Sequence, residues 1–170
     1  MNAKLTFTIY AFFILVAQKL IFSDAITILS NKYPVFIFIY PLVILSLPIE
    51  FNRLLSLIIA FIAGLLIDVF NDTLGMNAFA LLIMAYLRNP ILNLLEPRQG
   101  YKPDSSSFRS YGVFWVLSYL SILLGIHILA FYSIDAFTFV YFKRILICTL
   151  LNLLASVPFG FLILILIKPK

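Results

Sequence analysis

Charged residues are scarce in this chain. They make up 11% of its 170 residues, whereas hydrophobic residues make up 64% and the mean hydropathy is +1.11. A typical soluble domain has about 25% charged residues, so this composition excludes a soluble globular protein and indicates an integral membrane protein. A membrane-spanning helix needs roughly 20 mostly apolar residues. We therefore expect an all-α bundle of about six transmembrane helices that forms one domain over residues 1–170.

Cysteine and histidine are nearly absent as well. Cys148 cannot form an intramolecular disulfide because it has no second cysteine, and His127 has no other histidine with which to build a metal cluster. The sequence also has no nucleophile elbow, phosphate-binding loop or zinc motif. We therefore assign no catalytic residue, no metal ligand and no cofactor.

The net charge of +5 does not indicate nucleic-acid binding, because the basic residues lie between apolar runs, where they act as topology signals. With both termini in the cytoplasm, four basic residues lie outside: Lys19, Lys32, Lys143 and Arg144. Eight lie inside: Lys4, Arg53, Arg88, Arg98, Lys102, Arg109, Lys168 and Lys170. This excess favours a multi-pass membrane protein with both termini in the cytoplasm and a cytoplasmic loop at 96–110.

The apolar runs predict six spans. They lie near residues 5–22, 33–48, 54–70, 76–95, 113–132 and 143–167. The first run continues without a clear cleavage site and is interpreted as an uncleaved span. Pro41 predicts a kink in the second span, and Pro90 predicts one in the fourth. We expect Arg88 to extend to a membrane interface as an anchor, in preference to binding a substrate.

Small and polar side chains recur along one face of two predicted spans. In the third span they are Ser56, Ala60, Ala63, Gly64 and Asp68, and in the last span they are Thr149, Asn152, Ser156 and Gly160. Small residues let helices in a membrane approach closely, so we expect both faces to pack against protein.

Asp68 is costly within a span, about 2.5–3.5 kcal/mol at the centre of a helix, so it needs a polar partner. The possible partners are loop amides near residues 71–74, Asn77, Asn152 and a basic residue, and the sequence does not choose among them. Asp72 or Thr73 is expected to cap the fourth span. We interpret His127 as a hydrogen-bonded packing residue in preference to a proton relay, because a relay needs several titratable groups.

The stretch GLLIDVFNDTLGMNAFALLIMAYLRN, residues 64–89, resembles the central signature of the rod shape-determining protein MreD family. The matching residues are Gly64, Leu65, Leu66, Asp68, Leu74, Gly75 and Ala78. The proline-containing second run, the Pro-Arg-x-Gly-Tyr segment at 97–101 and the last span with Thr149, Asn152 and Pro158 are similar to the form of this family in Bacteroidetes-like bacteria.

The resemblance implies a non-enzymatic component of the cell-elongation machinery that acts as a scaffold for MreC and for peptidoglycan-synthesis partners. Under this hypothesis, the loop with Arg98, Lys102 and Arg109 meets cytoplasmic partners or anionic lipid. MreD proteins are similar in architecture to the substrate-binding subunits of energy-coupling-factor transporters, and a vitamin transporter subunit is the alternative. Those subunits usually carry an Ala-x-x-x-Ala motif in the first span, whereas here Ala11 is followed at that spacing by Leu15.

Overall fold

The computed structural model describes residues 3–21, 26–27, 33–101, 111–136 and 139–166. Two two-residue strands, β1 (Ile26–Thr27) and β2 (Pro34–Val35), pair antiparallel, and a short 3-10 helix, η2, covers Phe139–Tyr141. The α-helices of the described chain are α1 (Ala3–Ile21), α2 (Leu42–Leu45), α3 (Arg53–Asn71), α4 (Met76–Leu94), α5 (Val113–Ala136) and α6 (Phe142–Leu166). The described part of the protein is therefore all-α with six α-helices.

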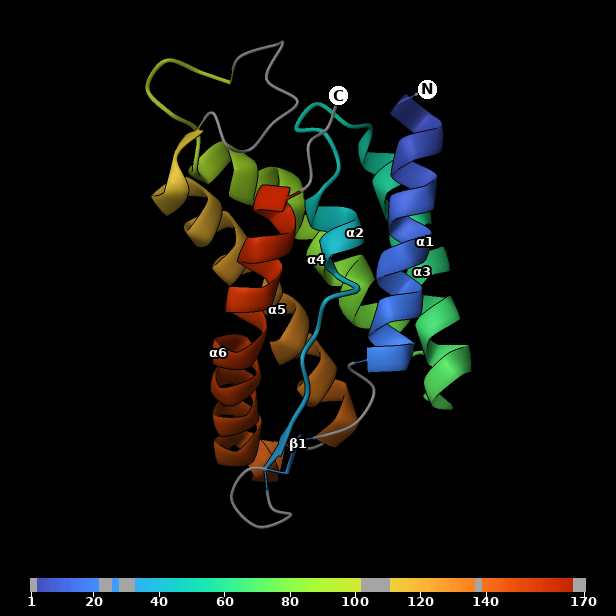
Figure 1. Ribbon diagram of the computed structural model, residues 1–170. Coiled ribbons are helices and arrows are strands. Elements are labelled where there is room, and N and C mark those ends of the chain that lie inside the picture. The colour runs from blue at the N-terminus through green and yellow to red at the C-terminus, as the bar shows by residue number, and fades with distance from the viewer. Residues whose placement is uncertain (1–2, 22–25, 28–32, 102–110, 137–138, 167–170) are drawn as a thin grey trace.

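The helices form an elongated bundle (Figure 1). Helix α1 begins and α6 ends at the same end of the bundle, drawn at the top, and α3, α4, α5 and α6 run alternately away from it and back. Helices α3, α5 and α6 are long and apolar enough to cross a membrane. This is the architecture of a multi-pass membrane protein.

The second predicted span does not form a membrane-crossing helix. Residues 36–39 form an extended segment (Figure 1) that leads into a turn at Tyr40 and Pro41, and only the four residues of α2 are helical. Pro34 and Pro41 lack the amide hydrogens that a continuous helix needs, and the alternating aromatic and β-branched side chains between them favour an extended backbone. The extended segment runs along the length of the bundle between α1 and α6 (Figure 1).

Side chains from α1 and α6 take the place of helical hydrogen bonds along this extended segment. Gln18 of α1 accepts from the backbone amides of Ile39 and Tyr40 at 2.7 and 3.2 Å, and its own amide donates to the Ile37 carbonyl at 3.0 Å. From α6, Asn152 accepts from the Phe36 amide and Ser156 accepts from the Phe38 amide. Non-helical backbone is tolerated at membrane depth when protein groups satisfy its polar atoms in this way.

The core lies around α2, whose four side chains are all buried against residues of the longer helices. Gly160 of α6 packs here, since a β-carbon at this glycine would lie 3.2 Å from the Leu120 side chain and 3.4 Å from that of Leu42. The outward faces of α3 and α6 expose large apolar side chains, including Leu54, Ile62, Val69, Leu150, Leu154 and Leu162. These faces suit contact with lipid.

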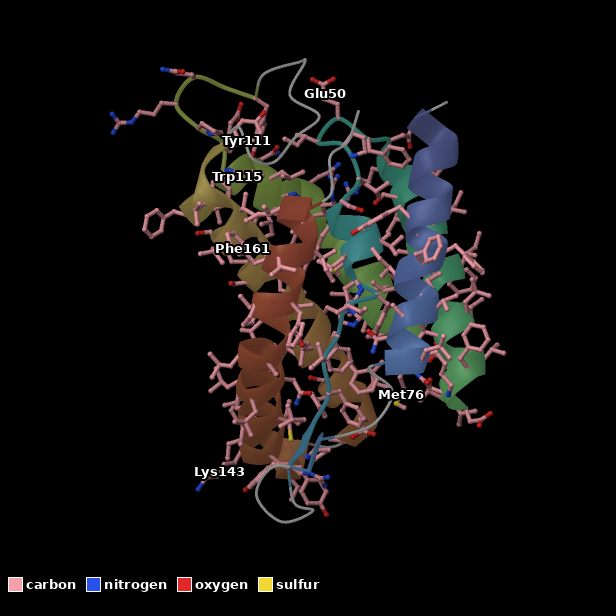
Figure 2. The ribbon with its side chains drawn as sticks, viewed as in Figure 1. Glu50, Met76, Tyr111, Trp115, Lys143 and Phe161 are labelled. Atoms are coloured by element: carbon pink, nitrogen blue, oxygen red, sulfur yellow. The ribbon has the colours of Figure 1, made fainter. Side chains whose placement is uncertain are left out.

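Aromatic side chains gather at the end of the bundle where α4 ends and α5 begins (Figure 2). Trp115 stacks on Tyr119 with ring centroids 5.3 Å apart and donates to the Leu95 carbonyl at 2.8 Å. Tyr101 donates to the Leu92 carbonyl at 2.6 Å. Burial, with a smaller contribution from Glu96, raises the pKa of Tyr101 to about 12, so its hydroxyl stays protonated and keeps this hydrogen bond at ordinary pH. The cluster matches the aromatic belts found at membrane interfaces.

Candidate functional site

Helices α3 and α4 meet in a tight corner that begins at Gly64. A β-carbon built on Gly64 would lie 2.3 Å from the Ala78 α-carbon and 2.7 Å from its backbone nitrogen, well inside van der Waals contact. Glycine at this position therefore allows the two backbones to touch. Asp68 lies one turn further along α3, so the same approach brings its carboxylate to the first turn of α4.

The Asp68 carboxylate is buried and accepts four hydrogen bonds. Oδ1 accepts from the Thr73 hydroxyl at 2.5 Å, the Asn77 backbone amide at 3.0 Å and the Asn77 side-chain amide at 2.9 Å. Oδ2 accepts from the Ala78 backbone amide at 2.9 Å. The Asn77 and Ala78 amides belong to the first turn of α4, where helical amides lack partners within the helix. Asp68 therefore caps α4 from the preceding helix, where its negative charge also interacts favourably with the helix dipole.

The turn between the helices differs from the cap that the sequence predicts. Neither Asp72 nor Thr73 caps α4, because Gly75 occupies the cap position with φ 82° and the Thr73 hydroxyl donates to Asp68. Asp72 takes a left-handed conformation with φ 54° and ends α3. Of the sequence-predicted partners of Asp68, Asn77 provides two hydrogen bonds. Asn152 instead binds the extended segment.

The residues that carry the family resemblance are divided between this corner and the outer surface. Gly64, Asp68 and Ala78 meet, and Gly75 supplies the positive φ that opens α4. Leu65, Leu66 and Leu74 face outward, and Leu74 is fully exposed.

A chain of hydrogen bonds continues from Asp68 into the core. The Tyr40 hydroxyl donates to Asn77 Oδ1 at 2.7 Å and lies 2.6 Å from His127 Nε2. Because the Asp68 carboxylate only accepts, Asn77 turns its NH₂ towards Asp68 and its oxygen towards Tyr40. The single Tyr40 hydroxyl hydrogen then points to Asn77, so Nε2 of His127 carries the hydrogen that binds Tyr40.

Within this series of hydrogen bonds, His127 is a buried packing residue that fixes the position of the Tyr40 hydroxyl. His127 is fully buried, and its ring lies edge-on to Tyr40 with centroids 5.2 Å apart. The amide of Asn77 separates His127 and Tyr40 from Asp68, and a neutral amide does not readily take up and release protons. The arrangement supports a fixed network and does not form a continuous path of titratable groups.

The two small-residue faces are filled within the chain itself. Ser56, Ala60, Ala63 and Gly64 are buried on α3, and Thr149, Asn152, Ser156 and Gly160 are buried on α6. The α3 face receives α4 at Gly64. The α6 face receives the extended segment through the hydrogen bonds of Asn152 and Ser156.

The prediction that Arg88 extends to the membrane interface is wrong. Arg88 is 1% exposed, and its guanidinium donates to the Leu47 and Pro48 carbonyls at 2.6 and 2.9 Å and to the Tyr119 hydroxyl at 2.9 Å. It therefore satisfies carbonyl groups that follow the short helix α2, where the chain has no helical continuation. Arg88 is held inside the protein, so it does not count among the basic loop residues that determine topology. Helix α4 continues through Pro90 to Leu94.

Of the three basic residues assigned to the cytoplasmic loop, Arg98 is exposed. Lys102 and Arg109 lie outside the described residues.

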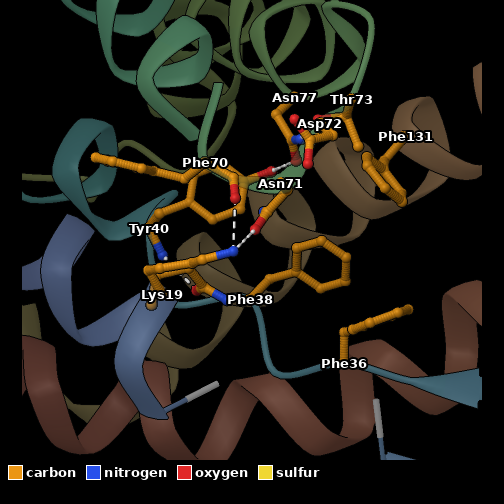
Figure 3. Close-up of a pocket in the computed structure, with 11 residues that line it drawn as sticks. Lys19, Phe36, Phe38, Tyr40, Phe70, Asn71, Asp72, Thr73, Asn77 and Phe131 are labelled. Carbon is orange, nitrogen blue, oxygen red and sulfur yellow. Dashed lines mark hydrogen bonds between the residues drawn. The ribbon is translucent and has the colours of Figure 1, made fainter. Parts of the chain in front are cut away.

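A cleft of about 360 Å³ (Figure 3) lies where α1 and α3 end, away from the aromatic cluster at the other end of the bundle (Figure 1). Its walls come from the ends of α1 and α3, the turn before α4, the extended segment and α5. Lys19 lies in it and donates to the Phe70 carbonyl at 2.5 Å and to the Asn71 side chain at 3.4 Å. Neither this cleft nor the roles of Gln18 and Tyr40 follow from the sequence, because they depend on contacts between residues far apart in the chain.

Metal binding finds no support in the described ranges, which contain no group of three histidine, cysteine or carboxylate side chains able to hold an ion. In comparisons with known proteins, no family model, no curated protein and no solved structure matches the chain.

Proposed function

We propose that this protein is a non-enzymatic scaffold of the bacterial cell-elongation machinery, of the MreD type, in the inner membrane. The observation that carries the proposal is the α3–α4 corner, because four of the seven residues behind the resemblance act together there. Gly64 and Ala78 set the helix approach, while Asp68 and Gly75 form the turn. Because these four residues act together to join α3 and α4 in this geometry, there is a physical reason for these residue types to occur together at these spacings.

A scaffold needs a fixed shape and free outer faces. The corner, the anchored extended segment and the Arg88 contacts hold the interior through buried hydrogen bonds. Because the small-residue faces are filled within the chain, the membrane span of a partner such as MreC would pack on the outward apolar faces of α3 or α6. The basic loop with Arg98 would meet cytoplasmic partners or anionic lipid.

The proposal includes six crossings, five by α1, α3, α4, α5 and α6 and one by the extended segment with α2. An even number of crossings leaves both termini on one side, in keeping with α1 beginning and α6 ending at the same end of the bundle. With Arg88 removed from the charge comparison because it is buried, seven basic residues remain on the side of the termini against four on the other. This excess favours termini in the cytoplasm.

Depletion of the protein in its own host tests the scaffold role. The expected result is cells that lose elongation and become wider, with normal width restored by the wild-type chain. A variant with Gly64→Leu, present in the membrane at the same level, should not restore it, because the side chain forces α3 and α4 apart. Unchanged cell width after complete depletion would refute the proposal.

The transporter alternative has one observation in its favour, the cleft of about 360 Å³, since small-molecule sites occupy volumes of about 300–1,000 Å³. A binding scan of the purified protein with water-soluble vitamins separates the two functions. Tight, saturable binding of one vitamin, together with the absence of MreC from the purified complex, would favour the transporter subunit over the scaffold.

A further inference from the structure

The cleft at the ends of α1 and α3 carries one charge of each sign. Among the described residues, Lys19 donates only to neutral oxygens, the Phe70 carbonyl and the Asn71 side chain. The Asp72 carboxylate lines the same cleft and has no hydrogen-bond or ion-pair partner within the described part of the chain. The two groups do not pair with each other. A ligand that satisfies both must itself carry a positive and a negative group.

Aromatic rings form much of the rest of the wall, beside the polar side chains of Gln18, Asn71, Thr73 and Asn77. Phe38 and Phe131 contact each other edge to face with centroids 5.5 Å apart, and Phe36 and Phe70 lie beside them in the cleft (Figure 3). Aromatic faces attract organic cations and also provide an apolar surface for a hydrocarbon chain. This combination favours a ligand with an ammonium group and an apolar part.

The position of the cleft in the bundle shows where such a ligand could come from. Lys19, Phe70 and Phe131 lie near the last residues of α1, α3 and α5, which end at the same end of the bundle. In a membrane-spanning bundle, the ends of helices lie at the level of lipid headgroups. The cleft is therefore accessible to a headgroup as well as to a small molecule from water.

We propose that this cleft binds a zwitterion with an ammonium and a phosphate on a short linker, as in the phosphoethanolamine headgroup of a membrane lipid. The phosphate binds the Lys19 ammonium, which has three hydrogens to donate, and the ligand ammonium binds Asp72 and the aromatic rings. Acyl chains leave the cleft along its apolar side. This inference is independent of the scaffold proposal, because it rests only on the charges and rings of the cleft.

Native mass spectrometry of the full chain tests the site. Phosphatidylethanolamine and phosphatidylglycerol with identical acyl chains are the probes, since both carry the phosphate and only the first carries the ammonium. Lys19 and Asp72 are both exposed, so the expected result is up to about fivefold higher occupancy by phosphatidylethanolamine, the upper end of the range for one exposed ion pair. Equal occupancy by the two lipids would overturn the proposal.

Two variants assign the effect to the cleft. Asp72→Asn removes the charge and suits the left-handed backbone, which asparagine tolerates, and it should abolish the preference between the lipids. Lys19→Gln should lower the occupancy of both lipids. Asp135→Asn and Lys143→Gln are matched controls, because they remove charges outside the residues that line the cleft, and they should keep the preference. A preference that survives Asp72→Asn in a protein of wild-type thermal stability would contradict the proposed contact.

Free phosphoethanolamine distinguishes the two sources of the zwitterion. Displacement of the bound lipid by free phosphoethanolamine supports headgroup recognition in the cleft. Binding of free phosphoethanolamine, sensitive to Asp72→Asn and without lipid preference, would assign a soluble zwitterion to the same groups and contradict the lipid as source.

Discussion

Replacing Asp68 with asparagine tests the α3–α4 corner with almost no change in side-chain volume. The amide keeps one acceptor oxygen for Thr73 and Asn77 but places an NH₂ group against the Ala78 backbone amide. A buried donor without a partner costs about 1–3 kcal/mol, and hydrogen bonds to a charged acceptor are about 1 kcal/mol stronger than those to a neutral one. The lost charge at the start of α4 adds up to about 1 kcal/mol. We expect Asp68→Asn to lower the free energy of unfolding by about 4 kcal/mol.

Unfolding in a denaturing detergent, followed by the fluorescence of Trp115, measures this loss. Trp115 is the one tryptophan of the chain and is packed against Tyr119. Asp72→Asn is the matched control, since it makes the same substitution four residues later on a carboxylate without a partner among the described residues, and it should change the free energy by less than about 0.5 kcal/mol. Equal effects of the two substitutions, or a loss below about 1 kcal/mol for Asp68→Asn, would refute the capping role.

Three further substitutions have expected outcomes, two of them in the same unfolding experiment and one in hydrogen exchange. Gly64→Ala should cost about 1–3 kcal/mol because its β-carbon meets Ala78 backbone atoms, which cannot rotate away, and an unchanged midpoint would mean that the helices do not touch. Gln18→Leu should remove the hydrogen-exchange protection of the Ile39 amide, whereas Gln18→Glu, which keeps the acceptor, should retain most of it. Arg88→Lys should cost about 2 kcal/mol because one ammonium cannot replace both Nη2, which donates to two backbone carbonyls, and Nε, which donates to Tyr119, whereas an interfacial anchor would tolerate the change.

The ends of most of the long helices follow directly from the sequence, although α5 continues to Ala136, four residues beyond the predicted span 113–132. The predicted spans 54–70 and 76–95 correspond to Arg53–Asn71 and Met76–Leu94, and 143–167 corresponds to Phe142–Leu166. These runs are apolar over the length that a membrane requires, and polar or conformationally special residues bound them. Asn52, for example, caps α3 by accepting from the Leu54 and Leu55 amides. Local composition is sufficient information for such elements.

The extended second crossing and the burial of Arg88 depend on distant contacts. The alternation of aromatic and β-branched residues before Pro41 indicates an extended backbone, but hydropathy alone does not separate it from a helix. What makes the extended form possible is Gln18 from α1 and Asn152 from α6, the latter 116 residues away from Phe36. Likewise, Arg88 binds carbonyls 40 and 41 residues earlier. Every residue has a backbone carbonyl, so the residue types do not reveal which carbonyls will accept these hydrogen bonds.

The scaffold proposal is tested most directly by what remains bound to the protein in its native membrane. The tagged chain is extracted in mild detergent and purified by affinity, and its partners are identified by mass spectrometry. We expect MreC and enzymes of cell-wall elongation in the wild-type sample, at a level that falls when Gly64→Leu disrupts the α3–α4 corner. Recovery of a pair of ATPases with a transmembrane coupling subunit, and no elongation protein, would contradict the scaffold and assign the chain to a transporter.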